Sequence, residues 1–158
     1  MTRLPALGSR GEGWVVAQGV LLVLTAATGW LGPAWDGTAR IVGGLVGLAL
    51  IGGGTLLATR GLHDLGTALT PFPHPLAGAA LIQSGVYRRV RHPIYGGIVL
   101  ASVGWGLLTA SIPALIMAAV TWGFFTVKSM REEVWLVERF PDYPAYRTRT
   151  RRLFPWLG

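Results

Sequence analysis

The sequence contains no cysteine and little charge. Without cysteine, the chain cannot form disulfide bonds, thiolate metal sites, cysteine nucleophiles or a prenylated C-terminus. Charged residues make up 13% of the 158 positions, whereas a soluble domain is about one quarter charged. Because 51% of the residues are hydrophobic, this deficit indicates that much of the chain lies in a lipid bilayer.

Lysine is almost absent too, since Lys128 is the only lysine among the 14 basic residues. An arginine-rich chain with 23 glycines suggests a GC-rich prokaryotic genome. The formal net charge of +7 is compatible with binding to nucleic acid or to anionic lipid. The basic residues alternate with apolar runs instead of forming one polar face, so we expect no nucleic-acid partner.

Four segments carry no charge for 15 or more residues: 14–31, 41–58, 93–110 and 113–127. Each is slightly shorter than the ~20 residues of a typical spanning helix, but interfacial flanking residues extend it. A soluble helical core is the alternative, and it would leave too little polar surface. We predict an all-α integral membrane protein, a single domain over residues 1–158 with about four transmembrane helices and a C-terminal cytoplasmic amphipathic helix region.

Basic residues flank these spans asymmetrically. If four helices cross the bilayer, every basic residue except Arg40 lies on the same side. By the positive-inside rule that side is the cytoplasm, so we expect both termini there and the protein in a prokaryotic plasma membrane. This topology requires the first span to be retained, and we see no convincing small-residue cleavage site for a signal peptide.

The second span contains many glycines, including Gly43 and Gly47 at GxxxG spacing. Small residues let transmembrane helices approach closely, so packing between helices is the simplest interpretation and a homodimer contact is the alternative. The three histidines, His63, His74 and His92, are spaced unlike any metal-ligand motif. We expect them to be ordinary loop or interfacial residues and expect no metal.

A helix is expected over residues 129–140, after the fourth span. One face of it carries residues at helical spacing: Met130, Glu133, Leu136, Val137 and Phe140. Glu133 therefore lies in a stripe that should be buried, whereas Glu132 points elsewhere, toward a solvated ion pair with Lys128. Because a buried carboxylate is costly without a cation, Glu133 needs either a protein arginine or a positively charged ligand as its partner.

The sequence YRRVRHPIYGG brings Arg91 and His92 to the start of the third span. Only a short stub joins the third and fourth spans, so they should form a hairpin with this basic segment and Glu133 at the same end. A site with cations on one wall and a carboxylate on the other suits a zwitterionic cofactor. The glycines Gly96 and Gly97 would let a ligand approach the backbone closely.

Two motifs carry a resemblance to a known family. GVYRRVRHPIYGG at residues 85–97 and EEVWLVERFPDYPAYR at residues 132–147 resemble, in order and spacing, the isoprenylcysteine carboxyl methyltransferase and phospholipid methyltransferase superfamily. Those proteins are small integral-membrane enzymes that use S-adenosyl-L-methionine. The resemblance covers roughly the C-terminal half of the chain. One departure is Pro141, where glycine commonly follows the phenylalanine.

The resemblance implies roles for individual residues. The expected cofactor-binding residues are Arg91, His92, Pro93, Tyr95, Gly97 and Glu132. Glu133, the second of the paired glutamates, is expected to be catalytic, and Arg139 matches an arginine that orients or activates the methyl acceptor. In a straight helix Arg139 points nearer to Glu132 than to Glu133, so it reaches the site only if the helix ends or bends near Pro141. The alternative is that Arg139 stacks on Trp135.

The implied function is methyl transfer from S-adenosyl-L-methionine to a membrane-associated lipid or hydrophobic small-molecule acceptor. The cofactor would bind in a cytoplasmic region formed by residues 60–97 and 128–158, and the acceptor would arrive laterally from the bilayer. An NADPH-dependent membrane reductase of the steroid-reductase type is one alternative, but Ile94 and Ile98 replace the asparagine and glutamate of its motif. A non-catalytic membrane scaffold is another, and it gives no reason for a buried Glu133.

Overall fold

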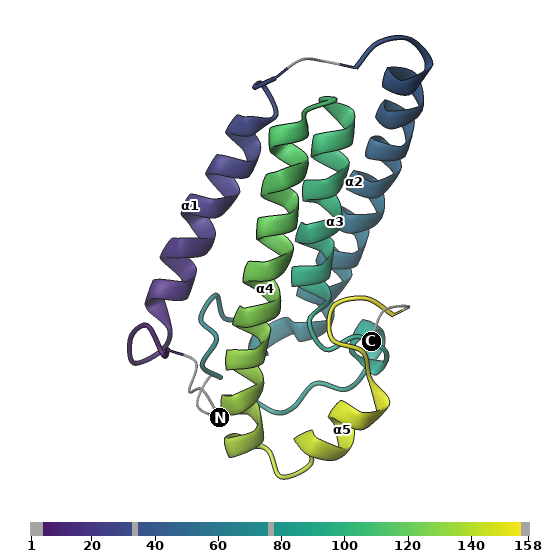
Figure 1. The fold of residues 1–158 in the computed structure, drawn as a ribbon. Coiled ribbons are helices and arrows are strands. Elements are labelled where there is room, and N and C mark those ends of the chain that lie inside the picture. The colour runs from purple at the N-terminus through teal and green to yellow at the C-terminus, as the bar shows by residue number, and fades with distance from the viewer. Residues whose placement is uncertain (1–4, 33–34, 76–77, 156–158) are drawn as a thin grey trace.

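The apolar runs fold into helices that lie side by side. The computed structural model describes residues 5–32, 35–75 and 78–155. Its elements are α1 (Glu12–Thr28), α2 (Gly37–Leu65), the short 3-10 helices η1 (Gly66–Ala68) and η2 (Gly85–Arg88), α3 (Pro93–Leu108), α4 (Ile112–Arg139) and α5 (Tyr143–Arg149). Figure 1 shows α1 to α4 as a bundle with α5 at one end. Within these ranges the chain is all-helical, apart from an isolated parallel bridge between Val90 and Arg151.

Helix α4 is longer than the sequence predicts. The predicted span 113–127 and the predicted helix 129–140 are one continuous helix of 28 residues. The prediction of two separate helices was wrong because no glycine or proline interrupts the chain between them. The helix begins after Ser111, whose Oγ accepts a hydrogen bond from the Ala114 backbone at 3.3 Å. It ends before Pro141, which disfavours helical geometry in the residue that precedes it.

Glycines bring α2 and α3 into close contact. A Cβ added at Gly47 would lie 2.6 Å from the Gly104 carbonyl oxygen, and a Cβ added at Gly54 would meet the Gly97 carbonyl in the same way. Such contacts leave no room for side chains, so the glycines are needed for this packing. The helix-packing interpretation is confirmed for these positions.

Polar and aromatic contacts attach α1 to the α3–α4 hairpin. The hydroxyls of Thr25 and Thr121 lie 3.1 Å apart in the buried interface between α1 and α4. The rings of Trp14 and Phe124 pack at 5.7 Å between their centroids. These contacts hold α1 against the middle of α4, where it can contribute a wall to the site described below.

The outer faces of the bundle are apolar and exposed. Gly37–Ala68 and Ile112–Arg139 are long and apolar enough to cross a membrane, and α1 and α3 are apolar but shorter. Apart from Arg40, the described basic residues lie toward the end of the bundle where α1 and α3 begin and where α2 and α4 end (Figure 1). Arg3 lies outside the described residues. The four crossings and the cytoplasmic orientation stay predictions.

Candidate functional site

A cavity of about 390 Å³ lies among the end of α2, the loop that follows it, the start of α3 and the last turns of α4. This volume falls within the usual range of small-molecule sites. Its polar lining consists of Gln18, Thr70, Tyr87, Arg91, His92, Tyr95, Lys128, Glu132, Tyr143 and Tyr146. Its other walls are mainly apolar and include Leu62, Leu65, Leu69, Phe72, Leu81, Ile82, Ile94, Ile98, Leu136 and Phe140.

The entrance to α3 is held by the last part of the described chain. The backbone amide of Arg91 donates to the Arg151 carbonyl at 2.8 Å, and that of His92 donates to the Arg152 carbonyl at 2.9 Å. Pro93 starts α3 in its first turn, a position where the missing amide hydrogen costs nothing. Together these features fix the backbone at residues 91 and 92, from which the Arg91 and His92 side chains reach α4.

Glu133 is 3% exposed and lies among two arginines and a histidine. Its Oε1 accepts a hydrogen bond from Arg91 Nε at 2.9 Å and another from Arg152 Nε at 3.4 Å. His92 Nε2 lies 3.3 Å from the same oxygen. The predicted burial of Glu133 is confirmed, and its partners are supplied by the protein itself. Glu133 is absent from the cavity lining, so it joins α4 to the α3 entrance and to the C-terminal segment.

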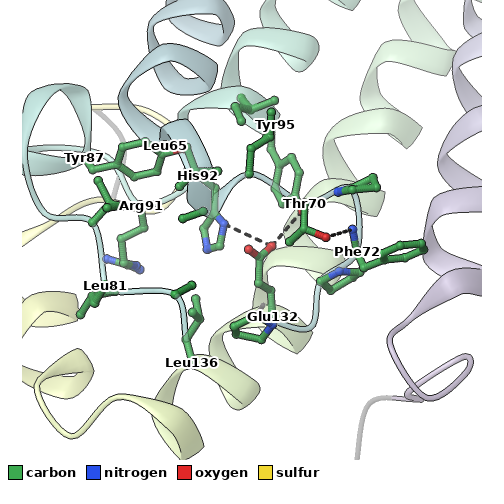
Figure 2. Close-up of a pocket in the computed structure, with 18 of the residues that line it drawn as sticks. Leu65, Thr70, Phe72, Leu81, Tyr87, Arg91, His92, Tyr95, Glu132 and Leu136 are labelled. Carbon is green, nitrogen blue, oxygen red and sulfur yellow. Dashed lines mark hydrogen bonds and ion pairs between the residues drawn. The ribbon is translucent and has the colours of Figure 1, made fainter. Parts of the chain in front are cut away.

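Glu132, by contrast, faces the cavity. Its Oε2 accepts a hydrogen bond from the Tyr95 hydroxyl at 2.8 Å and lies 3.6 Å from His92 Nδ1. Figure 2 shows the Glu132 carboxylate pointing toward the His92 and Tyr95 side chains across the pocket. The predicted solvated position of Glu132 was therefore wrong.

The stripe that was predicted to be buried on this part of α4 does not coincide with the face that is buried in the structure. Met130 and Val137 are 39% and 40% exposed, although both were assigned to the stripe with Glu133. Met130, Val134 and Val137 mark an outward apolar face of this helix, whereas Glu132 and Glu133 point toward protein. Such an arrangement is expected where the surroundings are apolar, because polar groups then find their partners inside.

Tyrosines form much of the polar wall. Burial raises the pKa of Tyr146 to about 12 and raises the pKa of Tyr87 and Tyr143 well above the usual value, so all three stay protonated at neutral pH. Tyr146 donates to the Tyr87 carbonyl at 2.7 Å, and Tyr87 to the Gly61 carbonyl at 3.3 Å. The buried Tyr143 hydroxyl has no hydrogen-bond partner among the described residues and is available to a ligand.

Pro93 and Gly97, both expected to bind a cofactor, do not line the cavity. Pro93 is buried against Gly61 of α2, and Gly97 faces α2 near the Gly54 carbonyl. Gly96 likewise lies against the Leu153 carbonyl. The expected approach of a ligand to these glycines was wrong, because the space that they leave is taken by other parts of the chain.

Arg139 lies exposed in the last turn of α4, outside the cavity lining. Its guanidinium is 5.9 Å from the ring centroid of Phe140, which does line the cavity. The alternative placement on Trp135 was wrong, because Arg131 occupies that ring at 4.0 Å. Arg131 and Trp135 are four positions apart, so their side chains lie on the same side of the helix.

Lys128 and Gln18 are among the cavity residues that were not identified as site residues from the sequence. Lys128 lies one helical turn before Glu132, and its Nζ is 2.5 Å from the Gln18 side-chain oxygen of α1. The available signals were weak: Lys128 is the only lysine, and Gln18 is the only amide in the first apolar run. Their contact joins positions 110 residues apart, which sequence spacing does not predict.

The residues present fit a zwitterionic cofactor such as S-adenosylmethionine. Glu132 offers a carboxylate to amino or hydroxyl groups, Tyr143 offers an unpaired hydroxyl, and the apolar wall offers a surface for a flat ring. In the described part of the chain, no group of three or more potential metal-ligating side chains comes together.

The chain is similar to one family model and to several known proteins. The family model described as phospholipid methyltransferase matches residues 42–143, which is more than half of the chain. The chain is 35% identical over 79 residues to protein-S-isoprenylcysteine O-methyltransferase of Schizosaccharomyces pombe, covering 49% of this chain and 34% of that protein.

Two bacterial relatives are also similar. The chain is 28% identical over 148 residues to the nickel-cobalt-cadmium resistance protein NccN of Alcaligenes xylosoxydans, covering 92% of this chain and 64% of that protein. It is 36% identical over 97 residues to methanethiol S-methyltransferase 1 of Bradyrhizobium diazoefficiens, covering 60% of this chain and 30% of that protein. The chain thus spans less than two thirds of the length of these relatives.

Proposed function

The chain belongs to the phospholipid methyltransferase family, and we propose that it transfers a methyl group from S-adenosylmethionine to a lipid or hydrophobic acceptor at the cytoplasmic face of a membrane. The observation that carries this proposal is the cavity in which His92 and Tyr95 of the α3 entrance meet Glu132 of α4. Two of the relatives described above are named methyltransferases, which supports the same chemistry.

We further propose that all four long helices cross the bilayer. Exposed apolar side chains on α1, α2 and α4, between which α3 is packed, support this, among them Val16, Val20, Val23, Ile41, Leu45, Leu48, Ile116 and Val120. A soluble monomer rarely exposes so large an apolar surface. The basic end of the bundle would then face the cytoplasm by the positive-inside rule, so that a water-soluble cofactor enters the cavity from that side.

The cofactor supplies an electrophilic methyl group on a sulfonium. Glu132 and Tyr143 would hold its polar groups, and the stacked rings of His92 and Tyr95, 5.4 Å apart, form one wall of the site. Methyl transfer needs little covalent help from a protein, so positioning supplies most of the acceleration, up to roughly 7–11 kcal/mol in favourable cases. The apolar wall of the cavity limits access of water to the reacting groups.

Glu133 and Arg139 have different proposed roles. Glu133 acts as a positioning residue, because it holds Arg91 and His92 in place without reaching the cavity. Arg139 lies beside Phe140 at the edge of the site, and we propose that it orients the acceptor there.

Calorimetry on the protein in phosphatidylcholine nanodiscs tests the proposal. We expect the wild type to bind S-adenosylhomocysteine but not NADPH. Glu132→Gln should weaken that binding about tenfold, since it removes the charge of a group that would bond the cofactor. Glu138→Gln is the matched control, because Glu138 is exposed on the same helix and makes no ion pair among the described residues. Binding of NADPH alone would favour the reductase, and binding of neither ligand would favour a scaffold.

A further inference from the structure

Lys128 is a buried cation on the cavity side of α4. It is 1% exposed, and its Nζ lies 2.5 Å from Gln18 Oε1. The same nitrogen lies 5.1 Å from the ring centroid of Tyr95 and 6.0 Å from that of Phe125. Among the described residues, Lys128 forms no ion pair with a carboxylate.

The surroundings of Lys128 leave its charge incompletely compensated. An ammonium has three donors, and the Gln18 amide accepts one of them. Aromatic faces add a weak attraction, but a cation in an apolar setting is costly unless an anion meets it. Arg91 shows the opposite case, because it is paired with the buried carboxylate of Glu133.

Lys128 borders the same cavity as Glu132 but lies one helical turn from it. It is four residues before Glu132, which places it about 6 Å further along α4 toward the interior of the bundle. Gln18, its partner, belongs to α1 and lies outside residues 42–143, the part that matches the family model. Lys128 itself lies inside that part, so the pair joins a residue of the matched region to one outside it.

Resting on the proposed function, we propose that Lys128, oriented by Gln18, binds the nucleophilic atom of the methyl acceptor as an anion. The acceptor is then a hydrophobic carboxylate or thiolate and not an amine. A protonated amine would bring a second positive charge next to a buried ammonium, whereas an anion supplies the charge that the ammonium lacks.

The reaction balances with an anionic acceptor. A carboxylic acid or thiol loses its proton to solvent on binding, and the resulting anion pairs with the Lys128 ammonium. The electron pair of the oxygen or sulfur forms the new bond to the methyl carbon, while the methyl–sulfonium bond breaks and its electrons stay on the sulfonium sulfur. The products are a neutral ester or thioether and a neutral sulfide, so no proton has to leave a buried nitrogen.

Three acceptors with the same chain length test this inference in phosphatidylcholine nanodiscs. The probes are dodecanoic acid, dodecanethiol and dodecylamine, with deuterated S-adenosylmethionine as donor and mass spectrometry as the readout. Calorimetry measures the affinity for S-adenosylhomocysteine and, with that ligand bound, the affinity for each probe. We expect the wild type to bind and methylate the acid or the thiol in preference to the amine, and the preferred probe identifies which anion is used.

Variants of the pair separate binding from folding. Lys128→Met should weaken use of the preferred probe about 100-fold, as expected on loss of one partner of a buried charge pair, with unchanged affinity for S-adenosylhomocysteine. Lys128→Arg should retain most of the wild-type preference because it keeps the charge. Gln18→Leu should raise KM about tenfold with a smaller change in kcat, since the ammonium loses the group that orients it.

The outcomes distinguish the two proposals. Failure of the wild type to bind S-adenosylhomocysteine would overturn the proposed function itself. If that ligand binds but the amine is bound and methylated as well as the acid and the thiol, only the role of Lys128 is overturned. Equal use of the preferred probe by Lys128→Met and the wild type also overturns it. Should Lys128→Met fail to fold, the proposal is still tested by whether the wild type and Lys128→Arg prefer the acid or the thiol to the amine.

Discussion

Glu132 and Glu133 are neighbours in the sequence, yet they lie in different surroundings. Consecutive residues on a helix point about 100° apart, so one carboxylate reaches the cavity and the other reaches the core. The Glu133 carboxylate contacts Arg91, His92 and Arg152, which are all side chains of the protein itself. Glu132 bonds Tyr95 and borders open volume. A buried carboxylate whose partners are all internal supports the fold, whereas one that borders a cavity is available to a ligand.

The largest expected effect is on Glu133. Glu133→Ala removes the common partner of Arg91, His92 and Arg152 and leaves Arg91 buried without a carboxylate. Breaking a buried ion pair in this way costs about 3–5 kcal/mol, so we expect a clear fall in Tm together with loss of S-adenosylhomocysteine binding. Fluorescence-monitored thermal unfolding in detergent measures the fall in Tm, with Glu132→Ala as the matched variant. If both variants unfold at the same temperature, the contrast between the two glutamates does not hold.

A double-mutant cycle sharpens the same contrast. Arg91→Met and Glu133→Gln, alone and together, should show a coupling energy of about 1–3 kcal/mol, because each residue is the other's closest charged partner. The same cycle with Arg91 and Glu132 should give a coupling near zero, since no ion pair joins them among the described residues. Unfolding free energies supply the values, and equal couplings in the two cycles would contradict the assignment.

Tyr95→Phe tests the cavity side with a smaller change. It removes the hydroxyl that donates to Glu132 at 2.8 Å and keeps the ring that stacks on His92. We expect a loss of about 1 kcal/mol in S-adenosylhomocysteine binding, roughly fivefold in affinity, with little change in Tm. Calorimetry and thermal unfolding on the same preparation separate the two effects. A large fall in Tm with unchanged affinity would place Tyr95 with the structural residues.

The smallest effect is expected at Glu138. This glutamate is exposed near the end of the same helix and makes no ion pair among the described residues. Glu138→Gln should change stability by less than about 0.5 kcal/mol and leave cofactor affinity unaltered. A measurable loss of affinity would show that charge anywhere on this helix affects the cofactor, and the contrast between Glu132 and Glu133 would then lose its meaning.

Much of the fold could be predicted because uncharged runs and their basic flanks are local signals. The error in α4 came from applying the rule for soluble helices, in which apolar residues face inward. Met130 and Val137 are exposed while the charged Glu133 is buried, as expected where the exterior is itself apolar. Periodicity therefore placed Glu133 on the buried side correctly and placed Met130 and Val137 there wrongly.

The site was only partly accessible to sequence reasoning. The short connection between α3 and α4 was enough to predict that Arg91 and His92 lie close to Glu133. The contacts of Lys128 with Gln18 could not be predicted, because they depend on how α1 packs against α4. The catalytic and cofactor roles of these residues stay predictions, which the binding experiments above address.

The hydrogen bonds between residues 91–92 and residues 151–152 also determine when the site can form. Residues 151–152 follow α4 in the sequence, so the segments that become α1 to α4 emerge from the ribosome ahead of them. The helices can therefore insert and pair through their local contacts while the α3 entrance still lacks its C-terminal partner. Completion of the cavity is then the last step of folding, so an unfinished chain in the membrane should not yet bind the methyl donor.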